Sequence, residues 1–169
     1  MTELLITGCD AAVHPGELLE GVDIAIDAGR ITSIAPSGEH LRESHARIDG
    51  AGLLAIPGLI NAHTHSPENC LRGAGERLPL EPWLCLMFGV GGRYDAEAHR
   101  ITALAGAIEM LRTGTTAVLD HLWMTPPSGE AIDAVMGAYR EIGIRAAVAP
   151  LMDDIDCTEE LAAREGVDY

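Results

Sequence analysis

The sequence contains no lysine, and its positive charge is limited to 11 arginines. These are outnumbered by 26 aspartates and glutamates, which give a formal net charge of −15. Binding to phosphate groups needs a basic patch. The charge balance therefore argues against nucleic acid, and against an anionic membrane surface, as partners.

Long hydrophobic runs and paired cysteines are also missing. No apolar run approaches the roughly 18 residues that a membrane-spanning helix needs. The first ten residues carry acid early and lack the basic-then-apolar pattern of a secretory signal, so we expect a cytoplasmic protein. No two cysteines form a CxxC pair, and we expect reduced thiols that serve as small buried apolar side chains. These cysteines are Cys9, Cys70, Cys85 and Cys157.

The composition is that of a globular protein, with 47% hydrophobic and 22% charged residues. Residues 1–57 read as β structure. In the stretch VDIAIDAGRITSIA, apolar and polar residues alternate on both sides of Ala28-Gly29, which predicts a hairpin with Gly29 at positive φ. Nothing catalytic is evident before residue 57, and we expect the early histidines to be ordinary surface residues. These are His14, His40 and His45.

From residue 58 onward, helices and strands alternate. A helix is predicted between the N-cap Asp95 and the stop Gly114, and a second one between Ser128 and Gly143. Apolar strands are predicted at 115–120 and 145–151, and a further helix starts near 156–165. The apolar stripes of the two helices are Ile101, Leu104, Ala105, Ile108 and Leu111, and then Ile132, Val135, Met136, Tyr139 and Ile142. This pattern favours a parallel sheet. Three βα units do not close a barrel, which needs about eight strands, so we expect part of a larger fold.

Two histidines follow the short apolar run that begins at Pro57. Alternate residues of a strand face the same side, so His63 and His65 point together while Thr64 points away. Two imidazoles that converge at the carboxyl end of a strand can hold Zn²⁺ or Fe²⁺. The alternative is a pair of strand-end side chains that hydrogen-bond to their neighbours.

Taken together, the segments GLLAIPGLINAHTHSPENCLRG, PLEPWL and EMLRTGTTAVLD resemble the amidohydrolase superfamily. The likeness is to its cytosine-deaminase-like and triazine-hydrolase branch, over about residues 4–145. The resemblance implies a distorted metal-dependent (β/α)₈ barrel with a small β-sandwich. Residues 1–57 would form the N-terminal part of the sandwich, and residues 58–169 the first three or so βα units of an incomplete barrel.

The resemblance also implies roles for individual residues. His63 and His65 match metal ligands, whereas Glu81 and Trp83 match a loop that lines the substrate pocket. The matches to Arg72 and Gly73 imply structure more than chemistry. The family's other ligands, two histidines and an aspartate from later strands, have no counterpart here, and neither does its proton-shuttling glutamate. Apart from the metal ligands, no catalytic residue is therefore expected in this segment.

A few more polar residues lie near the expected site. The sequence LDHLW places Asp120, His121 and Trp123 at the end of the second barrel strand, and His121 is a candidate pocket residue. Glu68 and Asn69 either line the pocket mouth or face water. Glu109 is expected on an exposed helix with no catalytic role. For His121, the alternative is a strand-end histidine that is hydrogen-bonded to the backbone.

The leading functional hypothesis is the N-terminal segment of a metal-dependent hydrolase that deaminates a small nitrogen heterocycle with metal-activated water. One divalent ion is expected, zinc rather than iron, with the remaining ligands supplied by a second polypeptide or by residues beyond this chain. We expect the assembled enzyme to be a homo-oligomer. One alternative is a non-catalytic interaction fragment, and another is a hydrolase of acyclic C–N substrates.

Overall fold

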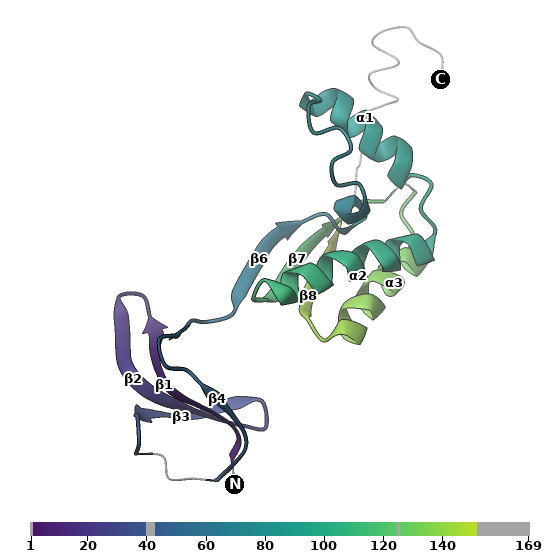
Figure 1. Cartoon of the computed structure of the whole chain (residues 1–169). Coiled ribbons are helices and arrows are strands. Elements are labelled where there is room, and N and C mark those ends of the chain that lie inside the picture. Colours follow the sequence, from purple (N-terminus) through teal and green to yellow (C-terminus); the bar gives the residue numbers. More distant parts are fainter. Residues whose placement is uncertain (1, 40–42, 125, 152–169) are drawn as a thin grey trace, which may run out of the picture. The chain divides into compact units, whose positions relative to one another are not determined.

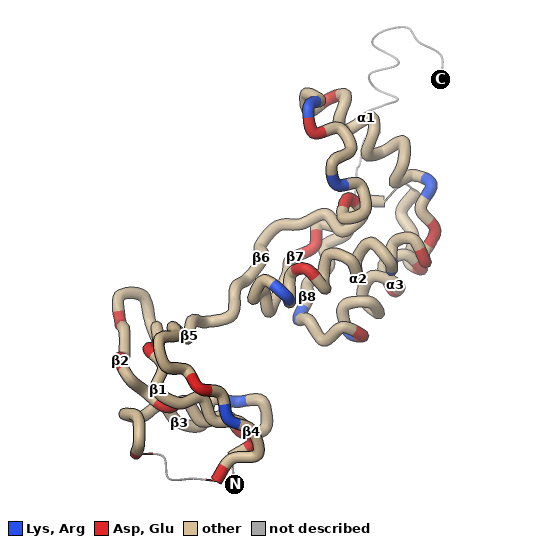
Figure 2. The backbone as a smooth tube through the Cα atoms, in the orientation of Figure 1, with Lys and Arg blue, Asp and Glu red and all other residues tan. Residues whose placement is uncertain are grey.

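The computed structural model describes residues 2–39, 43–124 and 126–151. The chain divides into two compact units, residues 1–57 and 58–169 (Figure 1). No helix in the described part of the chain is long and apolar enough to cross a membrane. Arginines lie scattered among more numerous acidic residues along the described backbone (Figure 2).

The first unit is a five-stranded sheet with the strand order β3-β2-β1-β4, in which β5 also pairs with β1. Ala28 and Gly29 both have positive φ, 48° and 70°, between the paired residues Asp27 and Arg30. This is the two-residue turn that suits the twist of a hairpin, so the predicted hairpin is confirmed. The strands are β1 (Thr2–His14), β2 (Glu17–Asp27), β3 (Arg30–Pro36), β4 (Ser44–Asp49) and β5 (Leu54–Ala55).

The second unit is a three-stranded parallel sheet with the order β6-β7-β8, and helices follow β6 and β7. Helices α2 and α3 lie together along one face of this sheet (Figure 1). Its elements are β6 (Leu59–Thr64), the 3₁₀ turn η1 (Ser66–Cys70), α1 (Leu80–Gly91), α2 (Ala96–Arg112), β7 (Thr115–Leu122), α3 (Gly129–Ile142) and β8 (Arg145–Pro150). The predicted helix starting near 156–165 lies outside the described residues.

The predicted helix ends are confirmed. The Asp95 carboxylate accepts a hydrogen bond from Ala98 N at 2.8 Å, and Ser128 Oγ accepts one from Ala131 N at 3.2 Å. Each side chain thereby satisfies a backbone donor that the first helical turn leaves unpaired. Gly143 follows α3 in the left-handed conformation, with φ 82°, which glycine adopts without steric cost.

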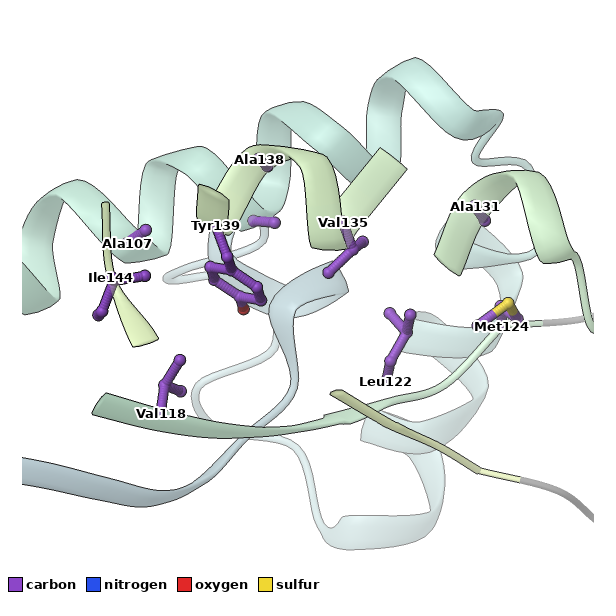
Figure 3. Packing of buried hydrophobic residues seen from close by; sticks show 10 residues of the cluster. Ala107, Val118, Leu122, Met124, Ala131, Val135, Ala138, Tyr139 and Ile144 are labelled. Carbon is purple, nitrogen blue, oxygen red and sulfur yellow. The ribbon is translucent and has the colours of Figure 1, made fainter. Parts of the chain in front are cut away.

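The core of the second unit lies between the sheet and the two helices. Val118 and Leu122 of β7 point toward Val135 and Tyr139 of α3 (Figure 3). All four side chains are at most 4% exposed. Helix α2 contributes the small residues Ala103 and Ala107 to this core, which allow it to approach the sheet and α3 closely.

The apolar stripe predicted for α2 is not its buried face. Ile101, Ile108 and Leu111 are exposed to 50%, 47% and 38%. The face of α2 that packs in the core is instead the adjacent one, made of His99, Thr102, Ala103, Gly106 and Ala107. Close packing selects small side chains on the buried face. Leu104 of the predicted stripe is partly buried against this core, whereas Ile101, Ile108 and Leu111 stay exposed.

Two of the cysteines also differ from expectation. Cys9 is buried, as predicted, but Cys70 and Cys85 are exposed. All three are free thiols, and Cys157 lies outside the described residues. His14 and His45 are exposed, as expected of surface histidines, and His40 lies outside the described residues.

Candidate metal centre

Strand β6 contains a bulge just before its end. Asn61 pairs with Val118 and Thr64 with Asp120, so three steps along β6 match two along β7. The Asn61 side chain stabilises the bulge, because its Oδ1 accepts a hydrogen bond from His63 N at 3.2 Å. Bulges are common next to active sites, where they change the direction of a side chain. In this strand, the bulge places both Asn61 and Thr64 on the side that faces α2. The two histidines do not lie on that side.

The imidazoles of His63, His65 and His121 lie close together. The ring centroid of His63 is 4.8 Å from that of His65 and 4.5 Å from that of His121. His65 and His121 are 6.2 Å apart. Along β7, Val118, Asp120 and Leu122 are buried on the helix side, and His121 takes the alternate position. The sheet therefore gathers three imidazoles, two of them predicted metal ligands and the third a predicted pocket residue.

A hydrogen bond fixes the orientation of the His65 ring. Its Nδ1 lies 2.7 Å from the backbone oxygen of His121, and because a carbonyl only accepts, Nδ1 must carry the proton. With the proton on Nδ1, the lone pair of an uncharged ring lies on Nε2, and no hydrogen bond among the described residues occupies that atom. Backbone carbonyls commonly orient metal-binding histidines in this way.

The side chain of Asp120 faces the helices and is fully buried. Its Oδ1 accepts a hydrogen bond from Ser66 N at 3.0 Å, and its Oδ2 accepts one from the Tyr139 hydroxyl at 2.8 Å. Burial, and then the nearby Asp120 carboxylate, raise the pKa of Tyr139 far above its usual range. The sequence placed Asp120 at the catalytic strand end, but strand alternation turns its carboxylate into the helix layer.

Glu68 forms a hydrogen bond with a side chain, and Asn69 forms one with the backbone. The two expectations, that they line the pocket mouth or that they face water, do not describe these contacts. Glu68 Oε1 accepts a hydrogen bond from Trp123 Nε1 at 3.3 Å. Asn69 Nδ2 donates to the Thr102 backbone oxygen at 3.1 Å. Both side chains are half-buried. They connect the turn after the histidines to β7 and to α2.

Glu81 and Trp83 lie in the first turn of α1, where the sequence predicted a loop. Pro79 and Pro82 suited a loop, but proline is also tolerated in the first turn of a helix. Glu81 is exposed and Trp83 is half-buried. Among the described residues, no hydrogen bond or ring contact joins either side chain to the three histidines. The later part of α1 is anchored by Phe88, whose ring meets Trp123 edge-on at 5.3 Å.

A groove of about 250 Å³ lies on the α2 side of β6. Its lining includes Asn61, Thr64 and Asn69 but none of the three histidines. Arg72 and Glu109, which also line it, form an ion pair between exposed side chains. The ion pair joins the segment after η1 to α2, and the groove is separate from the imidazole cluster.

The model of the amidohydrolase family matches residues 54–168 of the sequence. The chain belongs to the amidohydrolase family. This confirms the resemblance noted from the sequence. The match includes β6 with His63, the following residue pair Thr64-His65, and both helices that pack on the sheet.

The relatives of this amidohydrolase include several deaminases. The chain is 36% identical over 151 residues to 5-methylthioadenosine/S-adenosylhomocysteine deaminase 2 of Archaeoglobus fulgidus, covering 89% of this chain and 33% of that protein. It is also 36% identical over 149 residues to 5'-deoxyadenosine deaminase of Methanopyrus kandleri, covering 85% of this chain and 33% of the relative. The chain thus spans about a third of the length of these relatives.

Solved structures show the same fold. An adenosine deaminase from Xanthomonas campestris with bound zinc superposes with a TM-score of 0.79 at 29% identity, covering 98% of this chain and 38% of that one. Triazine hydrolase from Arthrobacter aurescens superposes with a TM-score of 0.78 at 27% identity, covering 94% of this chain and 38% of its own.

The imidazoles of this amidohydrolase fit one part of a metal site. His65 presents a free Nε2, and the His63 ring is exposed beside it. In the described part of the chain, however, no group of three or more His, Cys, Asp or Glu side chains is arranged to hold a metal ion. A catalytic zinc has three protein ligands and one open position. The chain therefore offers part of a ligand set.

Proposed function

We propose that this chain is the N-terminal segment of a metal-dependent aminohydrolase, in which His63 and His65 bind one divalent metal ion, zinc rather than iron. The observation that carries the proposal is the pair of imidazoles at the end of β6, with the His65 ring oriented by the His121 carbonyl at 2.7 Å. The zinc in the Xanthomonas structure supports the choice of ion.

The remaining ligands come from residues outside this chain, on a second polypeptide or on a further part of the same protein. Below, the assembled enzyme means this chain together with those residues. Residues 1–57 contribute to a small β-sandwich, and residues 58–169 form the first βα units of a (β/α)₈ barrel. The parallel order β6-β7-β8 and the exposed apolar face of α2 support this assignment. We assign the assembled enzyme to the cytoplasm as a homo-oligomer.

The reaction is hydrolytic release of ammonia from a small nitrogen heterocycle. A bound divalent ion would lower the pKa of water so that hydroxide forms near neutral pH. His63 and His65 would hold the ion, and His121 adds a third imidazole beside them. The names of the relatives favour an adenine nucleoside as substrate, because the amino group of adenine is the leaving group of a deamination.

Glu81 and Trp83 are proposed to bind the heterocycle. An indole offers a flat face for stacking, which is worth about 0.5–1.5 kcal/mol beyond burial. A carboxylate accepts strong, charge-assisted hydrogen bonds from N–H or O–H groups of a ligand. Both residues project from the first turn of α1, which would place them at the mouth of the pocket.

Ammonia release from a panel of substrates tests this function. The panel contains adenosine, 5'-deoxyadenosine, an aminopyrimidine, an aminotriazine and an acyclic amide, each incubated with the assembled enzyme. We expect ammonia from at least one ring, a raised KM in Glu81→Gln, and no turnover in the His63→Ala, His65→Ala double variant. Turnover of the acyclic amide alone would contradict the assignment to ring deamination. An unchanged KM in Glu81→Gln would remove Glu81 from the pocket.

A further inference from the structure

Asp120 is a buried carboxylate to which the reaction assigns no role. It is 0% exposed, and none of the ion pairs among the described residues includes it. Taking a charge out of water is costly unless the group is paired or well hydrogen-bonded. Both carboxylate oxygens of Asp120 are satisfied by neutral donors, Ser66 N and the Tyr139 hydroxyl. Because burying the Asp120 carboxylate is costly, its role should lie in the part of the structure that it stabilises.

Asp120 binds the backbone directly after the second histidine, at Ser66 N. Pairing between β6 and β7 ends at Thr64 and Asp120. Beyond that point, two hydrogen bonds continue to join the two chain segments. The Asp120 carboxylate accepts from Ser66 N at 3.0 Å, and the His65 ring donates to the oxygen of His121 at 2.7 Å. Residues 65–66 and 120–121 therefore bind each other reciprocally, with one side chain contributed from each segment.

Tyr139 fixes the carboxylate from the other direction. It is 2% exposed and comes from α3, so its position is set by the packing of the helix on the sheet. Its raised pKa keeps the hydroxyl protonated as a donor throughout the physiological range. One chain of hydrogen bonds, from Tyr139 to Asp120 to Ser66, thus links the core of the second unit to the backbone at His65–Ser66.

We propose that Asp120, oriented by Tyr139, is a positioning residue that fixes the His65–Ser66 turn and thereby the spacing of the two metal-binding imidazoles. This inference rests on the proposed metal site. Both oxygens of Asp120 are occupied on the helix side of the sheet, so it acts through the backbone of the turn and does not bind the ion itself. Its contribution is geometric, and an uncharged amide of the same shape, which can still accept the hydrogen bond from Ser66 N, should replace it.

The test compares Zn²⁺ affinity among variants of the assembled enzyme, measured by competition with a chromogenic chelator. Asp120→Asn keeps an acceptor for Ser66 N and offers Tyr139 a donor in place of an acceptor. Asp120→Leu has a similar size but no acceptor. Tyr139→Phe removes one hydroxyl. Val135→Ala is the matched control, because Val135 is also 0% exposed and lies in the hydrophobic cluster that contains Tyr139.

We expect Asp120→Leu to weaken Zn²⁺ binding by about 10–100-fold, which is the usual effect of removing a group that orients a ligand. Tyr139→Phe should weaken binding in the same direction by a smaller factor. Asp120→Asn should stay near wild type, and Val135→Ala should lower the unfolding free energy without changing the affinity. The visible spectrum of the Co²⁺-substituted protein should change in Asp120→Leu and not in Val135→Ala.

Two outcomes would overturn the inference. If Asp120→Leu binds Zn²⁺ as tightly as Val135→Ala, the turn does not depend on Asp120. If Asp120→Asn is as weak as Asp120→Leu, the charge matters and the geometric account is wrong. Failure of the proposed function gives a different result, because then either the wild type would bind no Zn²⁺ or the His63→Ala, His65→Ala variant would retain it, whatever happens at Asp120.

Discussion

Replacing Gly91 by alanine should displace helix α1, and Gly89→Ala provides a matched control in the same helix. A Cβ at Gly91 would lie 2.0 Å from Cη2 and 2.5 Å from Cζ3 of Trp123. A Cβ at Gly89 would meet nothing within 4 Å. The indole cannot easily move away, because Trp123 is 6% exposed, donates to Glu68 and meets Phe88 edge-on.

The size of the effect follows from the difference between the two variants. Exchanging glycine for alanine in a helix interior stabilises by about 0.8–1.0 kcal/mol, a gain that applies in full at Gly89 and less at Gly91, the last residue of α1. Overpacking a core costs typically about 1–3 kcal/mol, and only Gly91→Ala incurs that cost. Gly91→Ala should therefore be less stable than Gly89→Ala by about 1–3 kcal/mol, measured as unfolding free energy in urea on the assembled enzyme.

The displacement of α1 should also reach the substrate. Glu81 and Trp83 lie in the first turn of the same helix, so Gly91→Ala should raise KM, while the metal content, which depends on β6, stays unchanged. Gly89→Ala should leave both quantities at wild-type values. Equal unfolding free energies for the two alanine variants would refute the packing of Trp123 against Gly91, and an unchanged KM would separate α1 from the pocket.

Two further predictions concern the helices that pack on the sheet. Ser128→Ala removes the acceptor for Ala131 N at the start of α3 and should lower the unfolding free energy by about 1 kcal/mol. The control Asp133→Ala, on the exposed side of the same helix, should change the unfolding free energy by less than about 0.5 kcal/mol. Equal losses in the two variants would contradict the capping role of Ser128. Burial lowers the pKa of His99 by more than the nearby Asp120 and Asp95 carboxylates raise it. Below about pH 6.5, the unfolded chain therefore binds a proton at His99 that the folded chain does not bind. The stability that is present above that pH is lost as the pH falls. A His99→Gln variant should lose less unfolding free energy than wild type on acidification, and identical pH profiles would exclude His99 as a contributor.

The features that the sequence predicted well are those that local chemistry determines. Asp95, Ser128 and Gly143 mark helix ends because each satisfies backbone groups within its own helix or adopts a left-handed conformation there. The convergence of His63 and His65 follows from the alternation of side chains along a single strand. None of these predictions required knowledge of a distant partner.

The features that the sequence missed depend on pairing across the fold. The bulge before His63 is defined only by the register of β6 against β7, and the direction of the Asp120 carboxylate depends on which face of β7 the helices cover. The resemblance assigned Glu81 and Trp83 to a loop, whereas both residues lie in the first turn of α1. The buried face of α2 was misassigned because close packing preferred Ala103 and its small neighbours to the bulkier stripe.

Elemental analysis of the purified assembled enzyme tests the central claim most directly. The wild type should contain stoichiometric divalent metal, and the His63→Ala, His65→Ala double variant should contain none. The matched control is His14→Ala, His45→Ala, which also removes two histidines, both exposed and in the first unit, and it should keep the full metal content. Stoichiometric metal in the His63, His65 variant, with its fold intact by circular dichroism, would contradict the account.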